Sequence, residues 1–367
     1  MIAWEQALRR TVLEVGAYSP GVSAAEIKER YGLGEVVRLN WNESLFGPLP
    51  GVLDDTAAEL EQAWAYPEET YDEFRAAVAR FTGADPAQIV PGHGIQALTM
   101  ALANAFIEPG DAVIIPRPTY GLYAQVCRTA GAAVHRIDAP ALAFDLEAVA
   151  AAARVERAKL VWICDPNNPT GLRLDPHDWA RFLDALPDGC VAVADEAYAD
   201  YLAPELRIDR LSDVRAGRAV IVLRTFSKIF GLAGLRLGYA LVPEALAPYI
   251  HTVQEPFNVN RAALVAGLAS LRRSQLLPER REQVAEARAA LTERLRGAGI
   301  GYLPSQANFV LVAIGGDDVA ATDALARQGL LVRPGTELGL PGQVRVTIAE
   351  PAIMGRVADM LIGIAAG

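Results

Sequence analysis

The sequence has 367 residues, a formal net charge of −10 and 52% hydrophobic residues. This length predicts one large domain and a smaller one, with enough apolar material for a fully buried sheet. The negative charge argues against binding to nucleic acid or an anionic membrane, although a local basic pocket remains compatible with it. No apolar run approaches the ~20 residues that cross a bilayer, and the first residues lack the apolar core of a signal peptide. We therefore expect a cytoplasmic protein.

Cysteines and histidines form no metal-ligand pattern. The three cysteines, Cys127, Cys164 and Cys190, are widely spaced, and the four histidines are equally scattered. An odd number of separated cysteines suits a reduced chain. We expect no metal site.

Residues 1–45 are predicted to form an arm and a helix that pack on the smaller domain. Residues 46–255 are predicted to form the large α/β domain. Within it, short apolar, β-branched runs alternate with helical patterns, as in a mostly parallel sheet that is covered by helices on both faces. The expected strands are 88–92, 111–116, 132–137, 159–165, 190–196, 219–225 and 237–242. Helices are expected at 94–106 and 119–131.

Residues 256–367 are predicted to form a linking helix and a small α+β domain. A long amphipathic helix over 278–297 is closed by Gly297 and Gly299. An apolar segment, a helix near 318–328, two further apolar segments and a final helix follow. The sequence contains no internal repeat or low-complexity tract.

Lysine is rare in this chain, and one lysine stands in an unusual setting. Lys28 and Lys159 lie in polar patterns typical of the surface, whereas Lys228 lies in the apolar, glycine-rich segment TFSKIFGLAGL. Arginine is the usual cation here, but its guanidinium stays protonated and cannot form a Schiff base. A lysine at this place therefore indicates that the amine itself is needed.

Polar side chains follow several of the predicted strands. Asn168 lies in DPNNPTG, Asp195 and Tyr198 lie in ADEAY, Lys228 ends RTFSK, and Arg236 follows in GLAGLRLG. Ligands of open α/β sheets bind beyond the carboxyl ends of the strands, so we expect these side chains to meet at one edge. Taken singly, the aspartate is also compatible with a turn cap, and PNNPTG with a simple turn.

This set meets the requirements of pyridoxal 5′-phosphate (PLP). A buried carboxylate, here Asp195, keeps the pyridine nitrogen protonated, and Asn168 and Tyr198 can donate to the phenolate oxygen. The phosphate requires backbone N–H groups at a helix N-terminus, which the turn PGHGIQAL supplies. The further candidates for cofactor binding are Gly94, Ile95, Gln96, Thr225, Ser227 and Arg236 for the phosphate and Tyr120 for stacking on the ring.

Taken together, these motifs resemble a known family. RTFSKIFGLAGLRLGY, DPNNPTG, ADEAY and RPTYGLY are similar to the fold-type I PLP-dependent aminotransferases of class I/II, most of all to the histidinol-phosphate aminotransferase branch. LNWNESLFGP, YPEETYDEFRAAVARF and GLLVRPG support that branch, and the resemblance runs from about Tyr18 to about Ala349. It implies a large domain with a mostly parallel sheet and a smaller α+β domain.

The resemblance also implies roles for single residues. PLP would be bound covalently to Lys228, with Asp195 at the pyridinium nitrogen and Asn168 and Tyr198 at the phenolate oxygen. Tyr66 would reach the phosphate of a neighbouring subunit, which implies a homodimer with shared active sites. The substrate-binding residues implied are Tyr18, Asn42, Arg333 and Arg345.

Some positions depart from the family pattern. The chain reads Asn42-Glu43-Ser44-Leu45 where the family commonly has N-E-N-P, and Gln96-Ala97 where an acidic pair is frequent. His93 replaces a frequent asparagine and is compatible with a hydrogen-bonding role or with an ordinary loop position. These departures affect the choice of substrate more than cofactor binding, because the backbone donors are unchanged.

The implied activity is a ping-pong transamination, in which an amino donor such as histidinol phosphate gives its amino group to a keto acid such as 2-oxoglutarate. A second hypothesis is another reaction of the same fold: a threonine-phosphate decarboxylase, or a biosynthetic lyase, cyclase or oxidase. A PLP-binding transcriptional regulator would need a basic DNA-binding domain. The hypothesis of a nucleotide-binding dehydrogenase is supported by the turn GHGIQA alone, and this turn lacks the full G-x-G-x-x-G signature.

Overall fold

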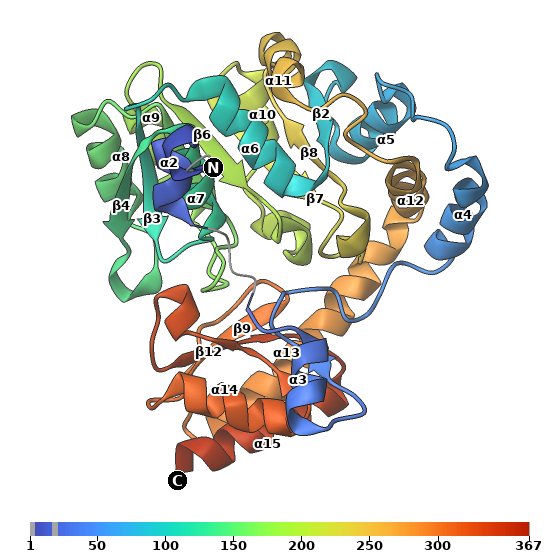
Figure 1. Cartoon of the computed structure of the whole chain (residues 1–367), viewed down its shortest axis with the longest axis vertical. Helices are drawn as coiled ribbons and strands as arrows, with labels where there is room; N and C mark the ends of the chain where they lie inside the picture. Colours follow the sequence, from blue (N-terminus) through green and yellow to red (C-terminus); the bar gives the residue numbers. More distant parts are fainter. Residues whose placement is uncertain (1–3, 17–20, 367) are drawn as a thin grey trace.

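The computed structural model describes residues 4–16 and 21–366. Two units lie one above the other in Figure 1, and the long helix α13 (Leu277–Gly297) runs from one to the other. The upper unit contains a seven-stranded sheet, and the lower unit contains a three-stranded sheet.

The large sheet has the strand order β2-β8-β7-β6-β5-β3-β4. Its strands are β2 (Ile89–Gly92), β3 (Ala112–Arg117), β4 (Ala133–Asp138), β5 (Leu160–Cys164), β6 (Val191–Asp195), β7 (Val220–Thr225) and β8 (Gly238–Leu241). Strand β8 runs antiparallel to both of its neighbours, and the neighbouring pairs among β3 to β7 are parallel. All seven expected strands are confirmed. Most are continuous apolar runs, which fill a sheet that is buried on both faces, whereas the edge strand β4 is largely exposed.

Helices cover both faces of this sheet. Along β5, Leu160 and Trp162 pack on one layer and Val161 and Ile163 on the other, as the two-residue period of a strand requires. The first layer contains α6 (Gly94–Phe106), α7 (Leu122–Ala130) and α11 (Ala247–Val253). The second contains α5 (Asp72–Thr82), α8 (Leu146–Val155), α9 (Pro176–Ala185), α10 (Arg210–Arg215) and α12 (Arg261–Arg272), with α4 (Val52–Glu59) packed on α12.

Helix α6 has the predicted bounds, but α7 begins later than the predicted residue 119. Gly121 is its N-cap, and the preceding residues form a turn that includes Pro118. Proline and glycine disfavour the interior of a helix, so the prediction of a helix from residue 119 extends too far toward the N-terminus.

The smaller unit is built on the antiparallel sheet β11-β12-β9, with strands Arg333–Pro334, Gln343–Thr347 and Phe309–Ala313. Helices α13, α14 (Asp318–Arg327) and α15 (Pro351–Ala366) pack in this unit. Strand β1 (Val37–Arg38) pairs in parallel with β10 (Leu330–Leu331), and α3 (Ala24–Tyr31) lies against α14.

The N-terminal helices do not all lie with the smaller unit. Helix α1 (Trp4–Ala7) precedes α2 (Arg10–Val15), and α2 contacts α7 of the upper unit (Figure 1). The Arg9 guanidinium donates to the Thr129 carbonyl over 2.8 Å. This differs from the expectation that residues 1–45 pack on the smaller domain as one arm. The domain boundaries at 45 and 255 stay predictions.

Within the described ranges 4–16 and 21–366, no helix is both long and apolar enough to cross a membrane. The same residues contain no group of three or more His, Cys, Asp or Glu side chains that could hold a metal ion. The three cysteines are buried and form no disulfide.

Candidate active site

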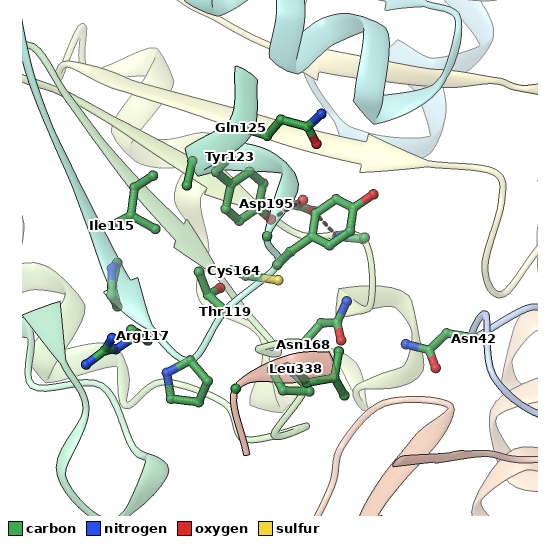
Figure 2. Close-up of a pocket in the computed structure, with 18 of the residues that line it drawn as sticks. Asn42, Ile115, Arg117, Thr119, Tyr123, Gln125, Cys164, Asn168, Asp195 and Leu338 are labelled. Atoms are coloured by element: carbon green, nitrogen blue, oxygen red, sulfur yellow. Dashed lines mark hydrogen bonds between the residues drawn. The ribbon is translucent and has the colours of Figure 1, made fainter. Parts of the chain in front are cut away.

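A cleft of about 1300 Å³ lies between the two units, beyond the carboxyl ends of β3, β5, β6 and β7. Figure 2 shows that Asp195, Cys164 and Asn168 line it from the upper unit, whereas Leu338 lines it from the smaller one. This is the place where ligands of open α/β sheets bind.

Most residues that the sequence singles out are brought together here. The cleft is lined by Asn42, Ile95, Gln96, Tyr120, Asn168, Asp195, Tyr198, Thr225, Ser227, Lys228, Arg236, Arg333 and Arg345. Gly94 lies behind Arg236, whereas Tyr66 lies elsewhere on the surface. Tyr18 falls outside the described residues.

The amine of Lys228 points toward the chain segment around Asn42. Its Nζ donates to the Asn42 carbonyl over 2.9 Å and lies 5.4 Å from the centre of the Tyr198 ring. Burial, the largest cause, and the nearby Arg345 together lower the pKa of Lys228 to about 8, against the opposing effect of Glu43. An amine with such a pKa is neutral often enough near neutral pH to act as a nucleophile.

Asp195 ends β6 and is buried. Its carboxylate accepts hydrogen bonds from the Tyr123 hydroxyl at 2.5 Å and from the Ala197 N–H at 2.9 Å. Burial raises the pKa of Asp195, an effect that Tyr123, Ala197 and Lys228 oppose. A cation placed opposite this carboxylate would lower its pKa again, because a nearby positive charge favours the ionised form.

Sequence reasoning missed Tyr123. Its ring stacks on Trp162 with 5.0 Å between ring centres and meets the Tyr120 ring edge-on with 5.4 Å between centres. The segment RPTYGLY could have indicated that Tyr123 lies beside Tyr120, because the second tyrosine follows the first by three residues. In the helix predicted over 119–131, side chains at that spacing lie on one face.

Tyr198 and Asn168 each keep a donor for a ligand in the cleft. The Asn42 amide donates to the Tyr198 oxygen over 3.1 Å, so the phenolic hydrogen remains available. The Asn168 carbonyl accepts from Arg345 over 2.7 Å, so its NH₂ group remains available. Arg345 also donates to the Asn40 carbonyl over 2.5 Å.

The N-terminus of α6 and the loop after β7 form an anion cradle. Gly94 has φ +75°, and a Cβ there would lie 2.7 Å from the Arg236 guanidinium. The Thr225 hydroxyl accepts from the Ser227 N–H over 3.0 Å, which keeps both hydroxyls at the base of the cleft. Backbone N–H groups at a helix start, together with hydroxyls and a guanidinium, suit a phosphate.

Two buried residues of the smaller unit hold the segment around Asn42 in place. The Asn42 N–H donates to the Thr347 hydroxyl over 3.0 Å, and Asn308 donates to the carbonyls of Asn42 and Glu43 over 3.1 Å each. Asn42 itself has φ +55°, which asparagine tolerates better than most residues. No local sequence pattern indicates these contacts.

A buried ion cluster, also missed, lies behind the site. Arg210 pairs with Asp165 at 2.6 Å and with Glu196 at 2.8 Å, and it stacks on Trp179 at 4.2 Å. Burial alone would raise the pKa of Glu196, but Arg224 and Arg210 outweigh it and hold that pKa below its usual value. Asp165 begins the loop of Asn168, and Glu196 follows Asp195, so the cluster ties two parts of the site together.

The remaining expected residues lie at the rim or outside. Arg333 pairs with Glu337 at 2.8 Å, directly opposite Arg345 across the β11–β12 pair. Tyr66 is 79% exposed and stacks on Phe257 with 4.8 Å between ring centres. His93 is exposed and its side chain makes no capping bond to α6.

Comparisons with known proteins agree with this geometry. The family model "Aminotransferase class I and II" matches residues 34–360. A histidinol-phosphate aminotransferase of Symbiobacterium thermophilum is 36% identical over 96% of this chain and 97% of its own length. That of Moorella thermoacetica is 34% identical over 93% and 88%.

A solved structure is similar over nearly the whole chain. The histidinol-phosphate aminotransferase of Sinorhizobium meliloti, crystallised with pyridoxal 5′-phosphate, superposes with a TM-score of 0.89 at 28% identity and covers 98% of this chain and 99% of its own. The family model matches most of the chain, and two relatives are more than 30% identical to it. These two findings establish which family the chain belongs to. The chain belongs to the class I and II aminotransferases, which are PLP-dependent enzymes.

Proposed function

We propose that this aminotransferase uses histidinol phosphate or a related amino acid as its amino donor and a keto acid such as 2-oxoglutarate as its acceptor. The observation that carries the proposal is the meeting, in one cleft, of the Lys228 amine, the buried Asp195 carboxylate and the guanidinium of Arg345. The names of the Symbiobacterium and Moorella relatives support the choice of donor.

The cleft offers a place for each part of the cofactor. The cradle formed by Ile95, Gln96, Thr225, Ser227 and Arg236 would hold its phosphate, and Asp195 would face the pyridine nitrogen. Tyr198 and Asn168 would donate to its phenolate oxygen, and Tyr120 would lie against the ring. When bound, PLP supplies an electron sink for the charge that develops on the carbon that carries the amino group.

Lys228 would hold the cofactor covalently and then move the proton. As a free amine in this chain, its Nζ has a pKa of about 8, which suits a base that would take up the α-proton of a substrate and return it. The Asn42 carbonyl, 2.9 Å away, gives the released amine a fixed acceptor. The side chain thus stays oriented while it is free.

Arg345 and Arg333 would bind the anionic group of the substrate. The two guanidinium groups come from paired positions of β12 and β11 and line the wall of the smaller unit. A forked guanidinium suits a carboxylate and a phosphate equally, so these residues serve both half-reactions. Asn42, and Tyr18 outside the described residues, would complete this end of the site.

We further propose a cytoplasmic homodimer with shared active sites. Tyr66 is exposed and held by Phe257 rather than by its own cleft, which suits contact with the cofactor phosphate of a second copy. Tyrosine is among the residues enriched at protein interfaces.

A panel of amino donors tests the function. Each donor is mixed with the PLP-loaded enzyme in a single turnover, and the absorbance of the cofactor is followed. Transamination predicts a lasting change to the pyridoxamine form, which 2-oxoglutarate then reverses. Release of carbon dioxide without that change would instead support the second candidate, a decarboxylase of the same fold.

A further inference from the structure

The outer part of the cleft contains a second group of arginines. Arg117 ends β3, Arg128 lies on α7 and Arg136 lies on β4, and all three line the cleft. Arg117 is paired with Asp138 at 2.6 Å. Among the described residues, neither Arg128 nor Arg136 makes a side-chain hydrogen bond or an ion pair.

These guanidinium groups lie close enough to repel one another. Burial lowers the pKa of Arg136, and the charges of Arg128 and Arg117 lower it further. Seven cationic and only three acidic side chains line the cleft, although the whole chain carries a net charge of −10. Cations that outnumber the acidic groups in a cleft focus a positive electric field there and attract anions.

The outer arginines lie away from the reacting amine. Figure 2 shows Arg117 and Asn42 on opposite sides of the pocket, and the Asn42 carbonyl accepts from Lys228. The cleft volume of about 1300 Å³ exceeds the usual ~300–1,000 Å³ of a small-molecule site. A substrate that reacts at Lys228 can therefore extend toward this end.

The inner arginines are already engaged, which distinguishes the two groups. Arg345 donates to Asn168 and to the Asn40 carbonyl, and Arg333 is paired with Glu337. Arg128 and Arg136 have no such partners in the described chain, so both guanidinium groups can bind an incoming oxyanion.

We propose that Arg128 and Arg136 form an outer anion subsite, which binds a second, distal carboxylate of a substrate whose reacting carbon lies at Lys228 and whose first anionic group is bound by Arg345 and Arg333. This inference rests on the proposed function, and it names the substrate class: elongated amino donors and keto acids with an oxyanion at the end remote from the amino or keto group.

The test uses the PLP-loaded enzyme and matched donors. Glutamate, which has a distal carboxylate, is compared with glutamine in single turnovers of the wild type, of the double variant Arg128→Ala/Arg136→Ala and of Arg80→Ala. Histidinol phosphate, whose one phosphate is assigned to Arg345 and Arg333, is the donor without a distal anion. Arg80 is an exposed arginine of α5 that does not line the cleft, and its variant is the control. We expect the double variant to lose about tenfold or more in kcat/KM for glutamate, and less than about twofold for glutamine and histidinol phosphate.

The choice of donors separates the outer subsite from the inner arginines. A selective loss for glutamate supports a distal carboxylate subsite, whereas a selective loss for histidinol phosphate would overturn it. Equal losses for charged and neutral donors, or no loss relative to Arg80→Ala, would overturn the proposal.

Binding of glutarate tests the outer anion subsite without requiring the transamination reaction. Glutarate has two carboxylates but no amino or keto group, so its affinity for the PLP-loaded enzyme, measured by equilibrium dialysis, does not require transamination. The subsite predicts weaker glutarate binding in the double variant than in Arg80→Ala, and unchanged binding would contradict it. A wild type that converts no donor, yet binds glutarate through these arginines, would refute the proposed function and leave the subsite intact.

Discussion

Opposing effects set the protonation of Lys228. Burial and the charge of Arg345 disfavour the ammonium form, whereas Glu43 and Asp195 favour it, and the balance places the pKa near 8 instead of 10.5. A lowered lysine pKa means that the neutral amine predominates above about pH 8.

The pH dependence of cofactor attachment follows from this balance. When PLP is added to cofactor-free chain, the rate of attachment to Lys228 should rise with pH and level off above about pH 8, because the neutral amine is the nucleophile. Stopped-flow absorbance of the lysine-bound cofactor measures this rate. A rate that keeps rising toward about pH 10 would mean that the site leaves the pKa of this lysine near its ordinary value.

The sequence predicts the position of some residues of the cleft but not of others. Lys228 and Asp195 follow strands of a parallel sheet, so their position in the cleft follows from chain order. Thr347 and Asn308 contact Asn42 from more than 260 positions away. No local pattern encodes such pairs, because the contact depends on how the smaller unit docks beside the sheet.

At the scale of elements, the buried cluster around Arg210 connects helix α10 with the loops after β5 and β6. A buried charge that loses its partner costs far more than a surface pair, since the remaining carboxylates are left desolvated. Arg210 is 2% exposed and has two such carboxylate partners, Asp165 and Glu196.

Arg210→Ala should therefore lower the free energy of unfolding by about 3–5 kcal/mol. The matched control is Arg181→Ala, which removes an exposed pair with Asp178 and should cost no more than about 1 kcal/mol. Denaturant unfolding of both variants measures the difference. Equal stabilities would show that the cluster contributes nothing beyond a surface ion pair.

The start of α6 gives a second prediction at this scale. Gly94→Ala should weaken PLP binding by about tenfold or more, because the added methyl group displaces the Arg236 guanidinium from the cradle. Gly189 has a similar φ of +79°, and a Cβ there would have no other atom within 4 Å, so Gly189→Ala controls for backbone strain. Spectroscopic titration with PLP compares the two affinities, and equal effects would contradict a phosphate cradle at Gly94.

Most of the elements could be predicted because their apolar periodicity is strong. Most strands of the large sheet are continuous apolar runs, the edge strand β4 being the exception, and α13 and α14 lie close to the expected ranges. The start of α7 could not be placed as well, because turn residues there interrupt an otherwise helical pattern. The contact of α2 with α7 differs from the expected packing on the smaller unit, since it is a tertiary interaction that the sequence of α2 does not specify.

At the scale of the whole molecule, the cleft depends on both units and on the N-terminal segment. Asn42 reaches Tyr198 from that segment, and Arg345 reaches Asn168 from the smaller unit. The proposed homodimer would add Tyr66 of a second copy to each cleft.

If each active site contains residues of both subunits, two inactive variants can restore activity when their subunits are mixed. Lys228→Ala and Tyr66→Ala should each be impaired as homodimers. Randomly mixed subunits should regain activity in roughly a quarter of the sites, because each heterodimer has one site with both residues intact. Activity after joint refolding of the two variants measures this. If the mixture stays at the mean of its parents, Tyr66 does not act on a neighbouring cleft.

Lys228→Ala with PLP tests most directly whether this amine holds the cofactor and moves the proton. We expect this variant to lose both turnover and the absorbance band of lysine-bound cofactor, whereas Lys159→Ala, which alters an exposed lysine before β5, keeps both. A Lys228→Ala enzyme that retained the band and the activity would contradict both roles of the lysine.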